Sequence, residues 1–459
     1  MDLLAPTKLD QAIPRERWAV VGGGVLGMLL AHRLAQAGRA VTLFEAAPQL
    51  GGLTSVWQLG GTTWDRHYHV IVPSDSYLRA VLRELQLDHE IRWVQTRVGF
   101  SVNGAMHSMS SAWEFLRFPP LNLLEKIRLA ATIGIAPRLY GWNALEAIPV
   151  EQWLRKWSGN AVTEKIWIPL LRSKLGENYR HTSAAFIWGS IQRMYAARRS
   201  GAKREVFGYV PGGYARILDR FQEQLARDRV TVRMRHAARS VEPQPSGEVA
   251  VQFENGHRES FDQVVLSMAA PIAARLCPRL TDDEKARLNG ITYLGILCAS
   301  VLLRKPLSGF YVTNLTDSWP PFTGVIEMTA LVDRQQFGSN TLVYLPKYLA
   351  SGDPAFALSD AEIEQSFLAA LFRMYPHLDR SDVLAFCLSR EKYVMAIPTL
   401  NYTTHLPPMH MSIPGLHIIN SAHIVTGTLA VDTTFQLGES AARQLVALPS
   451  RVAATAALP

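Results

Sequence analysis

The chain has 459 residues, enough for two or three domains, and its 48% hydrophobic and 19% charged residues exclude an intrinsically disordered protein. The net charge of +8 comes mainly from arginines spread along the chain, and no recognised nucleic-acid-binding module accompanies them, which argues against a nucleic-acid partner. We interpret the charge as a solvated basic surface, with attraction to an anionic substrate or a lipid headgroup as the alternative.

The cysteines and the N-terminal residues indicate a compartment. Cys277, Cys298 and Cys387 are far apart and predict no disulfide framework, which favours a reducing, cytoplasmic setting. Residues 1–17 have no signal-peptide pattern, and no apolar run is long enough to span a bilayer. The longest candidate is Leu129–Trp142, interrupted by Pro137 and Arg138. We predict a buried helix there, with peripheral contact to the inner face of the membrane as the alternative.

A strand, a glycine turn, a helix and a second strand follow one another within residues 18–45. Apolar Ala19–Val21 enters GGGVLG at positions 22–27, a helical pattern continues to Gly38, and the apolar run Ala40–Phe44 ends at Glu45. This order is the dinucleotide-binding fingerprint, in which the positive end of the helix dipole faces the phosphates. An ordinary βαβ unit is the alternative. We predict cofactor contacts at Gly22, Gly24, Val25, Leu26, Gly27, Glu45 and Ala46.

The glycines and the acid of this unit have separate predicted roles. Gly22 allows the tight turn out of the strand, Gly24 leaves room for the pyrophosphate, and Gly27 lets the helix pack closely on the sheet. Glu45 stands where it can accept hydrogen bonds from both ribose hydroxyls, and its charge would repel a 2′-phosphate. The unit therefore predicts a dinucleotide with a free ribose.

Two further glycine-rich segments follow the acid. Gly51-Gly52-Leu53-Thr54 stands where a nicotinamide dehydrogenase would continue into another helix, and residues 60–71 contain Asp65, His67 and His69. With these segments, the chain resembles the FAD-dependent amine oxidase superfamily, which includes protoporphyrinogen oxidases and phytoene desaturases. The resemblance implies that FAD is the cofactor and that Gly51, Gly52, Leu53 and Thr54 lie along its phosphates and ribityl chain.

The segment around Asp65 matches the family's F-D-x-G-x-H pattern, which the resemblance places near the flavin ring. His67 and Tyr68 depart from that pattern and would add polar groups to the flavin pocket. We predict that His69 contacts the cofactor and that His67 and His69 are catalytic. The alternative is that the two histidines point into core and solvent.

Residues 110–199 are mostly helical and rich in Trp and Leu, which predicts an inserted helical domain. The resemblance assigns such an insertion to the substrate-binding domain. Residues 167–176, WIPLLRSKLG, resemble W-x-P-L-L-x-x-K-F-G of protoporphyrinogen oxidase-like members. We predict that Arg172 and Lys174 contact an acidic group of the substrate; the alternative is a pair of surface charges near a helix end.

Residues 310–348 alternate in hydrophobicity and predict the sheet of the substrate domain. Tyr344 and Tyr348 are predicted to line the substrate cavity, with core packing as the alternative. Some amine oxidases hold a lysine, bridged by water, beside the flavin, and Lys347 is our candidate, with Lys392 as the other option. Hydrophobic periodicity predicts the remaining elements: helices at 74–86, 214–228 and 360–375, and strands at 92–100, 101–107, 230–234, 238–242, 249–253, 261–267 and 291–303. The resemblance implies that Val241 contacts the adenine through its backbone.

The C-terminal segment predicts a strand, a polar turn that includes Gly427 and Thr428, and a helix that starts near Asp432. Family members end in the same way, and the dipole of the last helix stabilises negative charge on the reduced flavin. Most members carry Gly-Asp where this chain has Asn420-Ser421. The resemblance implies cofactor contacts at Asn420, Ser421, Asp432, Thr433 and Thr434.

The predicted fold class is α/β. A Rossmann-like FAD-binding domain (GR2-type, central parallel sheet) comprises residues 15–100, 207–290 and 393–450, with tails at 1–14 and 451–459. An inserted α+β substrate-binding domain comprises residues 101–206, which are mainly helical, and 291–392. The central sheet is thus predicted to be closed by both ends of the chain.

The predicted function is an FAD-dependent oxidoreductase that oxidises (desaturates) a C–N or C–C bond of a small organic metabolite by hydride transfer to flavin N5. Oxygen or another acceptor would reoxidise the flavin. One alternative is a flavin-dependent nucleotide-sugar mutase, which would cluster arginines over the flavin, and another is a non-catalytic flavin-binding protein. The histidine spacing predicts no metal site.

Overall fold

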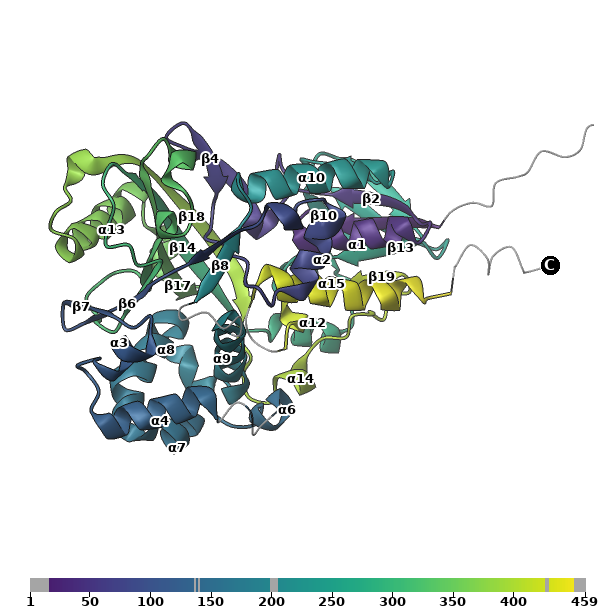
Figure 1. Ribbon diagram of the computed structural model, residues 1–459. Coiled ribbons are helices and arrows are strands. Elements are labelled where there is room, and N and C mark those ends of the chain that lie inside the picture. Colours follow the sequence, from purple (N-terminus) through teal and green to yellow (C-terminus); the bar gives the residue numbers. More distant parts are fainter. Residues whose placement is uncertain (1–15, 136–137, 139–140, 199–204, 426–428, 450–459) are drawn as a thin grey trace, which may run out of the picture.

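The computed structural model describes residues 16–449 except 136–137, 139–140, 199–204 and 426–428 (Figure 1). The predicted tails and the turn residues Gly427 and Thr428 lie outside the described residues. One half of the molecule is built on a parallel sheet, the other half on a larger mixed sheet, and a lobe of helices lies against the second half (Figure 1).

The first half contains the predicted parallel sheet, in the order β19-β13-β1-β2-β9. Its central strand is buried on both faces, because Trp18 and Val20 pack against helices while Ala19 and Val21 face a small antiparallel sheet. Such burial explains why β1 is apolar from Trp18 to Val21. The strands are β1 (Arg17–Val21), β2 (Ala40–Phe44), β9 (Thr231–Arg233), β13 (Gln263–Leu266) and β19 (Leu416–Ile418), and the antiparallel sheet comprises β10 (Ala238–Pro243), β11 (Val249–Phe253) and β12 (Arg258–Phe261).

The helices of this half come from both ends of the chain. Helices α1 (Val25–Gln36) and α15 (Val431–Val446) pack against each other, and a Cβ at Gly438 would lie 2.8 Å from the Leu29 side chain, so glycine permits the close approach. The sheet is therefore covered by segments about four hundred residues apart, as predicted. The other helices are α2 (Ser76–Glu84), α10 (Gly213–Arg227), α11 (Ala270–Leu276), α12 (Asp282–Asn289) and α14 (Tyr402–His405).

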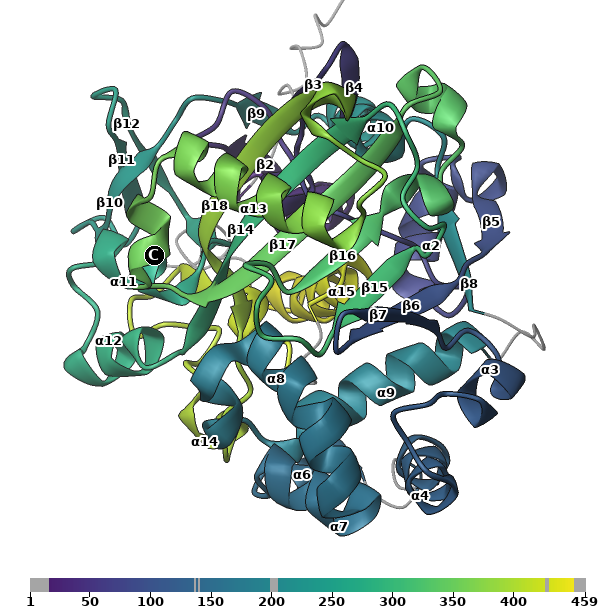
Figure 2. The same cartoon turned by 90° about the vertical axis from the view of Figure 1, so that its left-hand side faces the viewer.

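The second half contains a seven-stranded sheet in the order β18-β14-β17-β16-β15-β6-β7. Helix α13 (Asp360–Met374) lies across its outer face, and Ser359 caps that helix (Figure 2). The predicted strand at 291–303 and the predicted sheet at 310–348 are confirmed. The strands are β6 (Val98–Val102), β7 (Ala105–Ser108), β14 (Tyr293–Leu303), β15 (Val312–Leu315), β16 (Gly324–Glu327), β17 (Thr341–Ala350) and β18 (Val383–Ala396).

One predicted strand is wrong. Residues 92–100 form two strands in different sheets: β5 (Arg92–Gln95) pairs with β8 (Val206–Tyr209), whereas β6 joins the large sheet. Both stretches have strand character, so the sequence gives no signal for the change of sheet between them. Asn103 and Gly104, both at positive φ, form the hairpin turn between β6 and β7. A further hairpin comprises β3 (Val56–Leu59) and β4 (Thr62–Asp65).

The helical character of residues 110–199 is confirmed. The lobe comprises α3 (Ala112–Leu116), α4 (Leu123–Gly134), α6 (Trp142–Leu145), α7 (Val150–Val162), a π-turn at Thr163–Trp167, α8 (Ile168–Leu175) and α9 (Ala184–Arg198). Across the described ranges, no helix combines the length and apolarity needed to cross a membrane. The division into two domains stays a prediction, and β6 and β18 each cross one of its boundaries.

Candidate functional site

A cavity of about 1190 Å³ extends between the two halves of the molecule. On one side it is lined by residues that follow the carboxyl ends of β1, β2 and β13, which is where α/β sheets bind ligands. On the other side it is lined by residues of β14, β17, β18, α8 and α9. One continuous space thus joins the glycine turn to the large sheet.

The first glycine turn has the geometry that a phosphate requires. Gly22 has φ +113°, and a Cβ at Gly27 would lie 1.9 Å from the Gly22 carbonyl oxygen, so both predicted conformational roles hold. Gly24 lines the cavity, and its Cβ would meet no atom nearer than Gly52 Cα at 4.0 Å. No side chain caps the N-terminus of α1, which leaves its first N–H groups available to an anion.

Glu45 lies in the cavity wall beside that turn. Its Oε2 accepts a hydrogen bond from the Gly23 N–H at 2.6 Å, and its Oε1 accepts one from the Ala47 N–H at 2.7 Å. Each carboxylate oxygen retains a further lone pair for a hydroxyl donor. The Glu45 carboxylate is therefore placed to accept hydrogen bonds from the ribose, as predicted from the sequence. Ala46 also lines the cavity.

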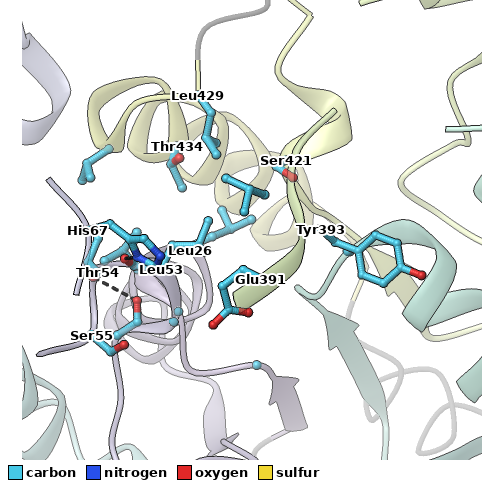
Figure 3. A pocket seen from close by; sticks show the side chains of 18 of the residues that line it. Leu26, Leu53, Thr54, Ser55, His67, Glu391, Tyr393, Ser421, Leu429 and Thr434 are labelled. Atoms are coloured by element: carbon cyan, nitrogen blue, oxygen red, sulfur yellow. Dashed lines mark hydrogen bonds between the residues drawn. The ribbon is translucent and has the colours of Figure 1, made fainter. Parts of the chain in front are cut away.

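The second glycine turn is bonded to the first. Gly51 donates its N–H to the Gly23 carbonyl at 2.8 Å, and a Cβ at Gly52 would lie 3.1 Å from Gly24 Cα. Thr54 donates its hydroxyl to the Gly51 carbonyl at 2.9 Å, within a short 3-10 turn (Figure 3). Gly51, Gly52, Leu53 and Thr54 all line the cavity, so the structure brings this predicted group together with Gly22, Gly24, Val25 and Leu26.

His67 and His69 both reach the cavity wall. Because a carbonyl oxygen only accepts, the Nδ1–H of His67 donates to Leu53 at 3.0 Å, and burial lowers the pKa of this ring to about 4. The buried Nε2 of His67 is then a lone-pair acceptor with no partner among the described residues. Burial likewise lowers the pKa of His69 to about 3, and its ring lies 4.8 Å from that of Tyr214.

Of the C-terminal residues predicted to contact the cofactor, some line the cavity and others do not. Ser421 and Thr434 line the cavity, and Figure 3 shows both across from His67. Asn420 accepts the Ala422 N–H through Oδ1, and its buried Nδ2 has no partner among the described residues. Thr433 caps the start of α15 through Ala430 instead of lining the cavity.

Asp432, predicted to contact the cofactor, and Asp65, in the segment that the resemblance places near the flavin ring, both cap helices. Asp432 Oδ1 accepts the N–H groups of Tyr77 and Leu78 at 2.8 and 2.9 Å, at the start of α2. Asp65 accepts the Tyr214 N–H at 2.8 Å, near the start of α10, and burial raises its pKa to about 7. The positive end of a helix dipole stabilises a carboxylate placed beside it. Our assignment of Asp432 to the cofactor is thereby corrected.

Three other predicted residues lie outside the cavity wall. Val241 is fully buried in β10 and paired with Val251, whereas Ala238 of the same strand lines the cavity. Tyr344 is buried and donates its hydroxyl to the Asp65 carbonyl at 2.6 Å. The side chain of Arg172 is 51% exposed and pairs with Glu177 at 3.3 Å.

Lys347 requires a correction. It has the strand parity of Leu345 and Leu349, which pack beneath α13, so its side chain belongs to the face of β17 opposite the cavity. Because side chains alternate between the two faces of β17, Lys347 does not reach the cavity, and our prediction of a catalytic role for it there is wrong. Lys392 lines the cavity.

Lys174 and Tyr348 meet in the part of the cavity next to the large sheet. Lys174 Nζ lies 5.5 Å from the centre of the Tyr348 ring, and burial lowers the pKa of the amine. The Tyr348 hydroxyl bonds that of Tyr68 at 2.9 Å. Lys174 forms no ion pair within the described part of the chain, so its charge is available to a ligand.

Two ion pairs at the cavity were not predicted from the sequence. Arg66 pairs with Glu391 at 3.1 Å, and Arg193 pairs with Asp75 at 2.9 Å. Their partners are over a hundred residues apart, so no spacing rule would find them. The wall residues Ser267, Met268 and Ala269 follow the carboxyl end of β13, and the rule for parallel sheets could have found them.

These features fit FAD. At the end suited to ADP, the N-terminus of α1 is uncapped, Gly24 leaves space for a phosphate, and Glu45 provides acceptors. At the other end lie His67 Nε2, which has no partner among the described residues, and the hydroxyls of Ser421 and Thr434. An apolar wall without these polar groups would not hold a dinucleotide.

Comparisons with known proteins agree with this geometry. Residues 27–446 match the profile of the family described as flavin containing amine oxidoreductase. The coproporphyrinogen III oxidase of Mycobacterium tuberculosis is 27% identical over 284 residues, which are 56% of this chain and 60% of that protein. The 15-cis-phytoene desaturase of Glycine max is 20% identical over 387 residues, 78% of this chain and 65% of that protein. This chain thus matches less than two thirds of the length of either relative.

Solved structures share the fold. An oxidoreductase from Methanosarcina mazei superposes with a TM-score of 0.72 at 17% identity, over 93% of this chain and 100% of that one. A reduced UDP-galactopyranose mutase superposes with a TM-score of 0.70 at 14% identity, over 96% and 98% of the two chains. At such identities the likeness concerns the fold alone.

Proposed function

The chain belongs to the flavin-containing amine oxidoreductase family and is an FAD-dependent oxidoreductase, and on that premise we propose that it oxidises a C–C or C–N single bond of an organic molecule bearing an acidic group. The observation that carries the proposal is the continuous cavity. It joins the residues suited to the dinucleotide to a compartment that contains Lys174, Tyr348 and apolar side chains.

FAD, when bound, supplies the acceptor for the two electrons and the hydrogen removed from the substrate. The protein's own contribution is to bind and orient. The Lys174 ammonium has no carboxylate partner within the described residues, so it attracts an anionic group into the cavity. The apolar residues Ile296, Phe207 and Val394 line the same compartment, where they exclude water from a carbon skeleton.

The polar groups in this compartment are held in fixed protonation states near neutral pH. Burial raises the pKa of both Tyr68 and Tyr348, which keeps their hydroxyls protonated. His67 is neutral and presents Nε2 as an acceptor. These groups orient a ligand by hydrogen bonding.

The alternative of a nucleotide-sugar mutase would need arginines over the flavin that are available to a diphosphate. The arginines in the described cavity wall are Arg66 and Arg193, and both are paired with carboxylates, Glu391 and Asp75. An arginine that is already neutralised attracts a phosphate weakly. This pairing favours the oxidoreductase.

The test uses purified protein loaded with FAD, mixed without oxygen with one candidate of each class: a porphyrinogen carrying carboxylates, a polyene and an amine. We expect bleaching of the oxidised flavin band by a carboxylate-bearing substrate, followed by recovery on admission of air or another acceptor. Absence of bleaching with all three classes, together with turnover of a nucleotide sugar only after chemical reduction, would favour the mutase. Retention of FAD with neither activity would favour a binding protein.

Lys347 supplies a matched control for the anionic anchor. We expect Lys174→Met to raise KM for the carboxylate-bearing substrate about ten- to a hundredfold, the loss of one charge-assisted contact worth roughly 1.5–3 kcal/mol. Lys347→Met removes the same charge from the opposite face of β17 and should leave KM unchanged. Equal KM values for the two variants would contradict the proposed role of Lys174.

A further inference from the structure

The helix that carries Lys174 is joined to the large sheet by two reciprocal hydrogen bonds. Helix α8 lies at the edge of the helical lobe, next to β17 (Figure 2). Ser173 Oγ donates to the Thr323 carbonyl at 3.0 Å, and Thr323 Oγ1 donates to the Ser173 carbonyl at 3.0 Å. The Ser173 carbonyl belongs to the last turn of α8, whose carbonyls have no partner within the helix. Thr323, directly before β16, thus fastens the end of α8 at the residue next to Lys174.

The hydroxyl of Thr323 also reaches the strand that carries Tyr348. Thr323 Oγ1 accepts the Tyr348 N–H at 3.2 Å, and the Thr323 N–H donates to the Pro346 carbonyl at 2.7 Å. The hydroxyl therefore uses its single hydrogen toward α8 and a lone pair toward β17. One oxygen atom connects the backbone of the residue before Lys174 to the backbone of Tyr348.

This connection matters because Lys174 lies against rings from two other elements. Its Nζ is 5.5 Å from the centre of the Tyr348 ring on β17 and 6.0 Å from that of the Phe186 ring on α9. Neither ring carries a charge, and the lysine stem is flexible, so these contacts alone do not hold the ammonium in one place. A change in the distance between α8 and β17 would move the ammonium relative to the cavity wall.

We propose that Thr323 is a positioning residue for substrate binding: its hydroxyl holds α8 against β17 and so places the Lys174 ammonium beside Tyr348, where the acidic group of the substrate binds. This inference rests on the proposed function, in which Lys174 attracts that group. If the hydroxyl only stabilised the fold, its removal would lower the free energy of unfolding without a selective effect on substrate binding. Two measurements separate these cases.

The first measurement needs no substrate. The full-length, FAD-loaded protein is labelled briefly with acetic anhydride, and mass spectrometry compares the acetylation of Lys174 with that of Lys285 on α12, in the other half of the molecule. Thr323→Val removes the hydroxyl and keeps the size of the side chain. We expect it to raise the Lys174-to-Lys285 ratio about three- to tenfold, because losing one hydrogen bond loosens α8 and admits the reagent. Thr323→Ser keeps the hydroxyl and should retain the original ratio; an unchanged ratio in Thr323→Val would overturn the inference.

The second measurement uses the carboxylate-bearing substrate that bleaches the flavin. Thr323→Val should raise KM about three- to tenfold and leave kcat nearly unchanged, and Thr323→Ser should restore KM. When Thr323→Val is added to Lys174→Met, it should change KM by less than about twofold, because the hydroxyl acts through the lysine. An equal effect of Thr323→Val with and without Lys174 would overturn the inference.

Thr316→Val is the matched control. Thr316 lies in the same connection between β15 and β16, and its hydroxyl donates to the Ser101 carbonyl of β6 at 2.9 Å, so its loss removes a similar bond. This variant should leave the labelling ratio and KM unchanged, and effects equal to those of Thr323→Val would overturn the inference. An effect of Lys174→Met on KM without one of Thr323→Val would overturn this inference alone. An unchanged KM in Lys174→Met would overturn the proposed role of Lys174 as well.

Discussion

Gly24 has no side chain and leaves free space in the cavity wall, and filling that space tests cofactor binding separately from folding. Gly24 has φ −68° and ψ 170°, which any residue can adopt, and a Cβ there would meet only Gly52 Cα at 4.0 Å. Gly24→Ala should therefore lower the free energy of unfolding of the apoprotein by at most about 1 kcal/mol, the cost of a poorer N-cap. The added methyl group would occupy the cavity wall where the pyrophosphate approaches the helix terminus.

The expected loss of cofactor affinity follows from the contacts displaced. Displacing one hydrogen bond from the backbone to a charged phosphate costs roughly 1.5–3 kcal/mol, so Kd for FAD should rise about ten- to a hundredfold. The assay is titration of apoprotein with FAD, followed by flavin fluorescence, beside chemical unfolding of the apoprotein.

Gly27→Ala is the matched control and should give the opposite pattern. A Cβ at that position would lie 1.9 Å from the Gly22 carbonyl oxygen, so the helix must move from the sheet, at a cost of about 1–3 kcal/mol of stability. If Gly24→Ala keeps an unaltered Kd, or if it destabilises the apoprotein as much as Gly27→Ala does, the assignment of the space at Gly24 to the phosphates is wrong.

The remaining predictions concern individual side chains. Asp432→Ala should reduce the free energy of unfolding of the apoprotein by about 1–2 kcal/mol, since it uncaps α2, and should leave the FAD Kd unchanged; a large change in Kd with unchanged stability would restore Asp432 to the cofactor site. Burial lowers the folded-state pKa of His67 from 6.5 to about 4, so the unfolded chain binds the extra proton first and stability falls as pH falls from about 6.5 to about 4. Urea unfolding of the apoprotein should show this fall in the free energy of unfolding for the unaltered protein and a shallower fall for His67→Gln. The two slopes against pH should differ by at most about 1.4 kcal/mol per pH unit. Identical slopes would contradict the burial of a neutral ring. Arg66→Met should leave the half-buried Glu391 without its partner and raise its pKa further. A pH titration of flavin absorbance would detect this as a shifted or new inflection, whereas an unchanged titration would place Glu391 away from the cofactor.

The sequence by itself determined the parts of this protein that depend on local geometry. Glycine at 22, 24, 27, 51 and 52 permits turns and close approaches that a side chain would block, so the turns and their ligand class follow from the order and spacing of the glycines and the apolar strands. The parallel sheet, the helical character of residues 110–199 and the large sheet followed from hydrophobic periodicity in the same way. The identification of FAD as the cofactor came from the resemblance to a known family, because the second glycine turn distinguishes a flavin site from a nicotinamide site.

Only the tertiary structure decided what each polar side chain does. Asp432 was predicted to contact the cofactor, and Asp65 lies in a segment that the resemblance places near the flavin ring, but each carboxylate accepts backbone N–H groups near the start of a helix. Lys347 and Lys174 are both lysines in apolar surroundings, and strand parity sends one away from the cavity while α8 turns the other into it. That α4 buries polar residues and exposes apolar ones was likewise hidden, since which face of an amphipathic helix is buried depends on the partners that the rest of the chain brings against it.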